Sequence, residues 1–199
     1  MSTLTGGGAA PPDDPARTGA GDAGAAPAWA DGALAIAAEP FDAPDSRRLI
    51  DELMADLEVR YAADMEPGQE NPELSGEQLV TADQVSPPDG VFLVARLGGR
   101  PVGCGALRPD RDGAPGVAEI KRMYVVPEAR GRGISRALLA ALEAEAVALG
   151  YRRVRLETGI RQPEAVRLYK SAGYHRIAGF GRYETDLLSL FFAKDLRPV

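Results

Sequence analysis

A short segment that combines glycines with arginines, residues 130–136, has the composition of an anion-binding loop. It follows a strand-like run at 123–127 and precedes an Ala- and Leu-rich segment that is typical of a helix. The first N–H groups of a helix have no intrahelical partner, and the peptide dipoles place about half a positive charge there. Glycine takes positive φ without steric cost, and guanidinium groups suit phosphate oxygens. We therefore predict a diphosphate site in this segment. Its residues are Arg130, Gly131, Arg132, Gly133, Ile134, Ser135 and Arg136.

Other phosphate-binding loops have different sequence patterns. The dinucleotide-binding fingerprint needs three glycines after the first strand of a βαβ unit, whereas this segment has two, after strands that look antiparallel. A P-loop ends in Gly-Lys-Ser/Thr, which does not occur in the chain. For the segment taken alone, an ordinary strand-to-helix turn with surface arginines is the alternative.

Three segments together resemble the signatures of the GNAT acyltransferases. Residues 130–135 are similar to the family's pyrophosphate loop, Arg/Gln-x-x-Gly-x-Gly/Ala; Arg130 and Gly133 match, and Ser135 replaces the usual small apolar residue. Residues 162–174 resemble the second signature, Ala-x-x-Leu-Tyr-x-x-x-Gly-Tyr/Phe, and residues 118–125 resemble the central strand. These matches cover residues 117–181, and weaker agreement extends over 34–196.

The fold that this resemblance implies is α/β, with a mostly antiparallel mixed sheet of about seven strands and about four helices. Apolar alternation and turn signals predict strands at 34–38, 91–97, 101–107, 117–126, 153–157, 174–177 and 188–193. Helices are expected after a cap at Asp45 or Ser46, at 75–85, from Ser135 to Gly150, and from Pro163. In the family, the two central parallel strands splay apart in a V and are joined by the helix that follows the loop.

By the same resemblance, the chain is expected to be an acetyl-CoA-dependent N-acetyltransferase that acetylates a primary amine of a small molecule. Main-chain groups of Met123, Tyr124 and Val125 would bind the pantetheine arm, and an N–H there would meet the thioester oxygen. Gln162, at the start of the second signature, is also expected at the cofactor. Two alternatives are an acetyl-CoA-binding sensor or scaffold without turnover, and an acetyltransferase that acts on a protein amine.

Tyr169 is the candidate general acid and is also expected to line the cofactor site. A phenol titrates near 10 and a thiol near 8.5, so proton exchange between them costs about 2 kcal/mol when neither is perturbed. The helical spacing of Leu168, Tyr169 and Ala172 also fits a core aromatic. The match to Leu-Tyr before Gly-Tyr favours the acid.

Glu119 is the candidate general base, and Glu157 on the neighbouring strand is a weaker one. An amine has a pKa of about 10.4 and a glutamate about 4.3, so proton abstraction needs a raised carboxylate pKa or a relaying water. Some family members use a glutamate at this strand position, and many have no dedicated base. The alternative for Glu119 is a structural carboxylate paired with Arg122 or Arg153.

Residues 1–32 differ in composition from the rest of the chain. Twenty of them are Gly, Ala or Pro, so this segment buries too little apolar surface to offset its ordering entropy. We therefore predict a disordered tail at 1–32 and an acetyltransferase domain at 33–199. The tail lacks the features of a secretory signal or a transit peptide, and no apolar run has the length of a membrane span.

Charge and cysteine content limit the partners. The net charge of −6 argues against nucleic acid. The single cysteine, Cys104, is expected as a small buried hydrophobe, and the absence of an export signal indicates the cytoplasm. No metal-ligand spacing occurs, so no metal is expected. Whether the chain forms a homodimer is left open.

The acceptor is expected to be a small cationic amine. Residues 66–90 contain six acidic residues and neither Lys nor Arg, and the region after the first helix commonly borders the acceptor side of the cleft in the family. An acidic wall attracts a cationic amine. A solvated acidic loop without a role in recognition is the alternative, and Arg182 would instead favour an amine that carries a carboxylate.

Overall fold

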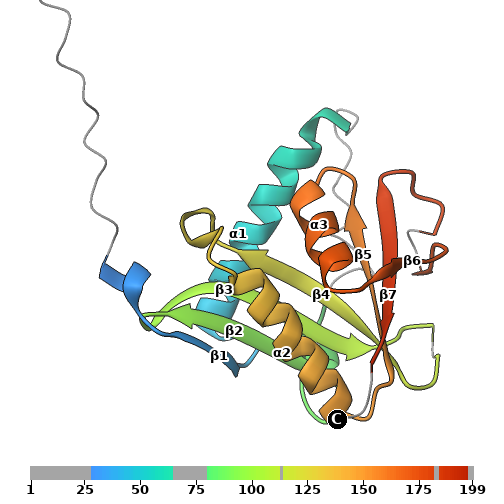
Figure 1. The fold of residues 1–199 in the computed structure, drawn as a ribbon, viewed down its shortest axis with the longest axis horizontal. Coiled ribbons are helices and arrows are strands. Elements are labelled where there is room, and N and C mark those ends of the chain that lie inside the picture. The colour runs from blue at the N-terminus through green and yellow to red at the C-terminus, as the bar shows by residue number, and fades with distance from the viewer. Residues whose placement is uncertain (1–27, 65–79, 113, 182–183, 197–199) are drawn as a thin grey trace, which may run out of the picture.

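Seven strands form one mixed sheet in the computed structural model, which describes residues 28–64, 80–112, 114–181 and 184–196. The strands lie in the order β1-β2-β3-β4-β5-β7-β6. Their bounds are Leu34–Ala38 (β1), Val91–Leu97 (β2), Arg100–Pro109 (β3), Val117–Val125 (β4), Arg153–Gly159 (β5), His175–Arg176 (β6) and Ser189–Asp195 (β7). Only β4 and β5 pair in parallel, so the prediction of a mostly antiparallel mixed sheet is confirmed (Figure 1).

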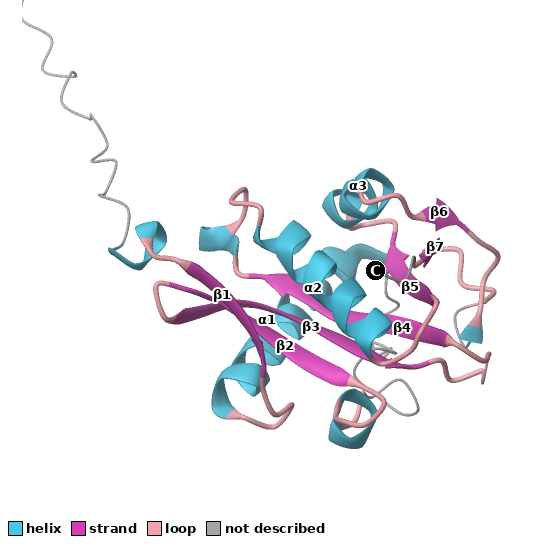
Figure 2. Ribbon diagram, turned by 60° about the horizontal axis from the view of Figure 1, so that its bottom comes forward, coloured by secondary structure: helices cyan, strands magenta, loops and turns pink. Residues whose placement is uncertain are grey.

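The described residues contain three α-helices, which are Pro44–Tyr61 (α1), Ile134–Ala148 (α2) and Pro163–Ser171 (α3). Figures 1 and 2 show α1 and α2 on opposite faces of the sheet, with α3 beside β5. The fourth helix was predicted at 75–85. Residues 75–79 lie outside the described residues, and Ala82–Val85 forms a 3-10 turn instead of an α-helix.

Each of the two long helices buries a stripe of residues three or four apart. In α1 the stripe is Leu49, Leu53 and Leu57, and in α2 it includes Leu138, Leu142 and Ala146. This is the spacing that places side chains on one helical face. The two helices therefore cover both faces of the central strands. Because the faces are covered, a site is expected at the ends of these strands.

The start of α1 differs from the prediction. The helix begins at Pro44, and the residue before it makes no side-chain cap. Proline suits the first helical position because its φ is already helical and its missing N–H would have no partner there. Asp45 instead accepts a hydrogen bond from Arg96 Nη2 at 2.8 Å, and Ser46 is fully buried in the first turn. Neither predicted cap residue acts as one.

The described part of the chain begins with a short turn that we had assigned to the tail. Ala28–Asp31 is a 3-10 helix, Ala30 is buried, and the Arg100 guanidinium stands 4.6 Å from the centre of the Trp29 ring. Residues 28–31 therefore form a turn in which Trp29 packs on the β2–β3 turn, while the boundary at residue 32 stays a prediction. Residues 1–27 lie outside the described residues.

The two parallel strands separate after a short paired stretch. β4 pairs with β5 only where residues 117–119 face residues 153–155. Beyond this point β4 has a bulge against β3, where the register shifts between Cys104 and Ala106 and Arg122 takes a φ of 57°. A bulge bends its strand and increases the local twist. Figure 1 shows β4 and β5 diverging from their common end, which confirms the predicted V.

Candidate active site

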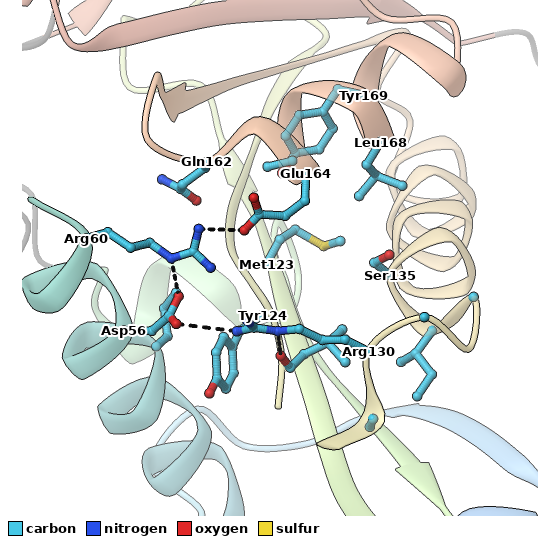
Figure 3. Close-up of a pocket in the computed structure, with 17 residues that line it drawn as sticks. Asp56, Arg60, Met123, Tyr124, Arg130, Ser135, Gln162, Glu164, Leu168 and Tyr169 are labelled. Atoms are coloured by element: carbon cyan, nitrogen blue, oxygen red, sulfur yellow. Dashed lines mark hydrogen bonds and ion pairs between the residues drawn. The ribbon is translucent and has the colours of Figure 1, made fainter. Parts of the chain in front are cut away.

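A cavity of about 220 Å³ lies beside the diverging end of β4, between α1, α2 and α3. The side chains in Figure 3 surround this space from three helices, one strand and one loop. The lining residues are Leu53, Asp56, Arg60, Met123, Tyr124, Val125, Ala129, Arg130, Gly131, Gly133, Ile134, Ser135, Gln162, Glu164, Ala165, Leu168 and Tyr169. The structure thus brings together most of the residues that the sequence predicts for a cofactor site.

The loop that leads into α2 owes its shape to two glycines. Gly131 has a φ of 78° and Gly133 a φ of 79°. Among the described residues, no atom lies within 4 Å of the position that a Cβ would take on either one. Glycine is therefore needed here for backbone conformation rather than for space. Because Gly133 is the N-cap of α2 and has no side chain, the first N–H groups of the helix are available to an anion.

The three arginines of the predicted diphosphate site do not gather around the loop. Arg130 lines the cavity, but its Nε donates to the Val125 carbonyl at 3.0 Å and its Nη2 lies 3.5 Å from Asp56. Arg132 donates from Nη1 to the Ala30 carbonyl at 2.9 Å, and Arg136 is exposed on α2 outside the cavity lining. Exposed guanidinium groups pair with nearby acceptors, so the predicted cluster of positive charge is not preassembled.

Tyr169 is a buried aromatic at the edge of the cavity, and its role as general acid stays a prediction. It lies on α3, lines the cavity, and is only 5% exposed. Its ring packs near Tyr174 and Phe192, with centroids 5.7 and 6.3 Å away. Burial raises the pKa of the phenol well above its ordinary value, and the charge of Glu157 raises it further. Tyr169 therefore keeps its proton and can donate a hydrogen bond into the cavity, although forming a buried tyrosinate is unfavourable.

Glu119 lies away from the cavity lining, in a buried ion pair. Its Oε2 accepts hydrogen bonds from Arg108 Nε at 2.9 Å and Nη2 at 2.7 Å, and Lys121 Nζ is 3.8 Å from Oε1. Gln84 accepts a further bond from Arg108 at 3.0 Å. The structural alternative for Glu119 thus has support, but the partner is Arg108 rather than Arg122 or Arg153. The pairing follows from register, since Glu119 faces Arg108 across the β3–β4 ladder.

Glu157, the weaker candidate, also lies outside the cavity lining. It is half-buried on β5 and accepts a hydrogen bond from the Ser189 hydroxyl at 2.8 Å. Its charge reaches both Tyr169 and Tyr61, because it contributes to raising the pKa of each phenol, after burial as the larger cause. A half-buried carboxylate near the cavity tyrosine is better placed to take a proton than a carboxylate held by a buried guanidinium.

A chain of ion pairs along the cavity was missed from the sequence. Arg60 Nε lies 2.7 Å from Asp56 Oδ2, and Arg60 Nη1 lies 2.6 Å from Glu164 Oε1 on α3 (Figure 3). Asp56 also faces Arg130, so the chain runs from the loop through α1 to α3. Asp56 and Arg60 are four residues apart, which indicates a helical ion pair. That spacing does not predict that Asp56 also faces Arg130 of the loop or that Arg60 also pairs with Glu164 of α3.

Two further properties concern the whole described chain. In the described ranges, no helix is both long and apolar enough to cross a membrane. Within the same residues, no group of three or more His, Cys, Asp or Glu side chains is arranged to hold a metal ion.

The fold and the cavity agree with a family match. The model of the acetyltransferase (GNAT) family matches residues 50–174, which is more than half of the chain. This stretch includes most of α1, the splayed strands, the glycine loop and all of α3. The chain therefore belongs to the GNAT family of acetyltransferases.

Individual relatives agree with this assignment. The chain is 42% identical over 137 residues to a protein named IAA acetyltransferase from Azospirillum brasilense, covering 69% of this chain and 84% of the relative. A GNAT-family acetyltransferase from Staphylococcus aureus superposes with a TM-score of 0.61 at 17% identity, covering 83% of this chain and all of that one. The PaiA N-acetyltransferase of Thermoplasma acidophilum, solved in complex with coenzyme A, superposes with a TM-score of 0.61 at 20% identity, covering 82% and 99%. The two solved structures establish the fold only.

Proposed function

We propose that this acetyltransferase uses acetyl-CoA to acetylate a primary amine of a small molecule. One observation carries the proposal: a single cavity joins the uncapped start of α2, the bulged end of β4 and the buried phenol of Tyr169. These features match the three parts of a thioester donor, which are a diphosphate, an extended amide-bearing arm and a leaving sulfur. Acetyl-CoA would supply the activated acyl group.

The start of α2 fits the diphosphate. Its first N–H groups lack a side-chain cap, and Gly131, Gly133, Ile134 and Ser135 all face the cavity. Backbone N–H groups together with the helix dipole bind phosphate without a large cluster of basic side chains. The main-chain groups of residues 123–125 border the same cavity and would hold the arm, with an N–H directed at the thioester oxygen. Gln162 lines the opposite wall.

The side chains near the cavity suggest how protons would move. Tyr169 would donate a hydrogen bond to the leaving sulfur, because burial keeps its phenol neutral. Glu157 would accept the proton of the amine, directly or through a water, since its charge is close enough to act on Tyr169. Glu119 stays a second candidate base, although its ion pair with Arg108 favours a structural role.

Calorimetry with coenzyme A tests the site directly. Gly133→Glu places a negative charge at the start of α2 and a side chain at a positive φ, so we expect no detectable binding. Gly150→Glu is the matched control: Gly150 also has a positive φ, 88°, but lies beyond the opposite end of α2. A folded Gly133→Glu variant that binds coenzyme A as well as the wild type would show that the diphosphate lies elsewhere.

A turnover assay then separates catalysis from binding alone. Acetyl-CoA is incubated with a panel of primary amines and, because of the named Azospirillum relative, with IAA, and free thiol is measured. We expect one class of amine to raise thiol release above the background rate. Binding of coenzyme A without release for any compound would favour a sensor or scaffold. Acetylation of IAA instead of an amine would replace the proposed acceptor class.

A further inference from the structure

Three consecutive β3 residues, Gly103, Cys104 and Gly105, lie against the part of β4 that borders the cavity. In the ladder Gly103 faces Val125 and Cys104 faces Tyr124, whereas Ala106 already faces Lys121. Gly105 is therefore opposite the extra residue of the β4 bulge. We call residues 103–105 the bulge cradle. All three are buried, so none of them can touch solvent or a ligand directly.

Cys104 holds the bulge by a hydrogen bond. Its Sγ donates to the carbonyl of Arg122 at 3.3 Å, and Cys104 is 0% exposed. Arg122 has a φ of 57°, the one positive value among the described residues other than glycine. Such a backbone is unfavourable for a residue with a Cβ, so the surroundings must hold it in place. Burial raises the pKa of the thiol to about 12, so the donor proton is present throughout the usual pH range.

The two glycines of the cradle let β4 approach closely. A Cβ on Gly103 would lie 2.7 Å from the Tyr124 carbonyl oxygen. A Cβ on Gly105 would lie 2.9 Å from Met123 Sδ and 2.8 Å from a methyl group of Leu142. All three distances are shorter than real Cβ contacts. A side chain at Gly103 would push on the main chain of Tyr124, whereas one at Gly105 would meet the ends of the flexible Met123 and Leu142 side chains. Unlike the loop glycines, Gly103 is needed for space.

We propose that the bulge cradle is a positioning element of the active site, in which Cys104 fixes the Arg122 carbonyl and so sets the direction of the main chain at Met123, Tyr124 and Val125. This inference rests on the proposed function, in which those groups hold the thioester arm. The cradle touches no reacting atom, and it acts through the backbone that follows the bulge. A displacement of about 1 Å in such groups is enough to lower a rate by about a hundredfold.

Replacement of the thiol tests the proposal. Cys104→Ala removes the donor, and we expect kcat to fall about tenfold and coenzyme A affinity about threefold or more. Cys104→Ser keeps a hydrogen-bond donor at the γ position, so kcat and coenzyme A affinity should both return to within about threefold of the wild type. Val94→Ala is the matched control, because Val94 faces Cys104 from β2, is 1% exposed, and lies on the strand that does not pair with β4. It should lower the melting temperature and leave kcat nearly unchanged.

The outcomes are distinguishable from failure of the proposed function. Wild-type protein that does not bind coenzyme A refutes the function itself, whatever the variants do. If the wild type binds and turns over, then equal activity losses in Cys104→Ala and Val94→Ala, at equal loss of stability, overturn the positioning role. A folded Cys104→Ser variant whose kcat and coenzyme A affinity stay as low as those of Cys104→Ala also overturns the positioning role. Should Cys104→Ala not fold, Gly103→Ala provides the second test: it should raise the KM for acetyl-CoA and lower kcat, and wild-type kinetics in this variant would overturn the proposal.

Discussion

The two sides of the cavity are built from different parts of the polypeptide. On the α2 side, the groups available to a ligand are main-chain N–H groups, shaped by Gly131 and Gly133 within one short loop. On the sheet side, the two candidate carboxylates lie outside the cavity lining and have partners from other strands: Glu119 is held by Arg108 of β3, and Glu157 accepts a hydrogen bond from Ser189 of β7. A main-chain site can therefore be recognised from a short motif, whereas the role of a carboxylate depends on what the fold places next to it.

Removal of the Tyr169 hydroxyl is expected to have the largest effect on rate. Tyr169→Phe should lower kcat by roughly tenfold to ten-thousandfold, the range for loss of a proton-transfer group, and leave coenzyme A affinity within about twofold. Tyr174→Phe is the control, since its ring is 5.7 Å from Tyr169 and it is also buried. Its rate should stay near that of the wild type. Equal losses of stability in both variants, with no rate effect in Tyr169→Phe, would leave Tyr169 as a core aromatic only.

The raised pKa of Tyr169 adds a pH test. A phenol with an ordinary pKa loses its proton near pH 10, but the folded protein holds the Tyr169 proton to higher pH. The wild-type kcat should therefore show no alkaline limb that depends on Tyr169 at or below about pH 10. A limb in that range that disappears in Tyr169→Phe would contradict the buried, neutral phenol.

Replacement of Glu157 should mainly lower the rate, whereas replacement of Glu119 should mainly lower the stability. Glu157→Gln is expected to lower kcat/KM by about tenfold to a hundredfold near neutral pH, with a smaller loss at high pH, where the amine deprotonates on its own. Glu119→Gln should mainly lower stability, by about 3 kcal/mol, because it leaves the buried Arg108 without its counter-charge. Rate profiles and denaturant unfolding measure the two effects. A pH-dependent rate loss in Glu119→Gln, with stability intact, would return the base to Glu119.

Truncation of the N-terminus should give the smallest effect. Deletion of residues 1–27 is expected to leave the melting temperature and turnover unchanged, given their Gly-, Ala- and Pro-rich composition. Deletion of residues 1–32 removes Trp29 from Arg100 and the Ala30 carbonyl from Arg132. We expect the melting temperature to fall by about 3 to 8 °C, equivalent to about 1 to 2 kcal/mol, and a small loss of coenzyme A affinity. Identical behaviour of the two truncations would show that this turn contributes nothing.

Local sequence patterns predicted the strands and helices better than they predicted the contacts between side chains. The structure has the strands on either side of Gly98-Gly99, the strand before the loop and the end of α2 before Gly150 where the sequence predicts them, because each depends on neighbouring residues only. The role of the arginines in binding diphosphate stays a prediction, and their contacts with the carbonyls of Val125 and Ala30 could not be predicted from local patterns. The acceptor wall expected at 66–90 lies largely outside the described residues, and so does Arg182.

The short parallel pairing has a mechanical consequence. Three residue pairs between β4 and β5 form the only ladder that joins the two halves of the sheet within the described chain. Beyond this ladder, side-chain ion pairs join the two halves across the cavity, such as Arg60 with Glu164 and, nearby, Arg161 with Asp64. Partly exposed ion pairs of this kind contribute about 0 to 1 kcal/mol each. We therefore expect that a ligand can move α1 and α3 apart at small energetic cost, while the backbone ladders on either side keep their shape.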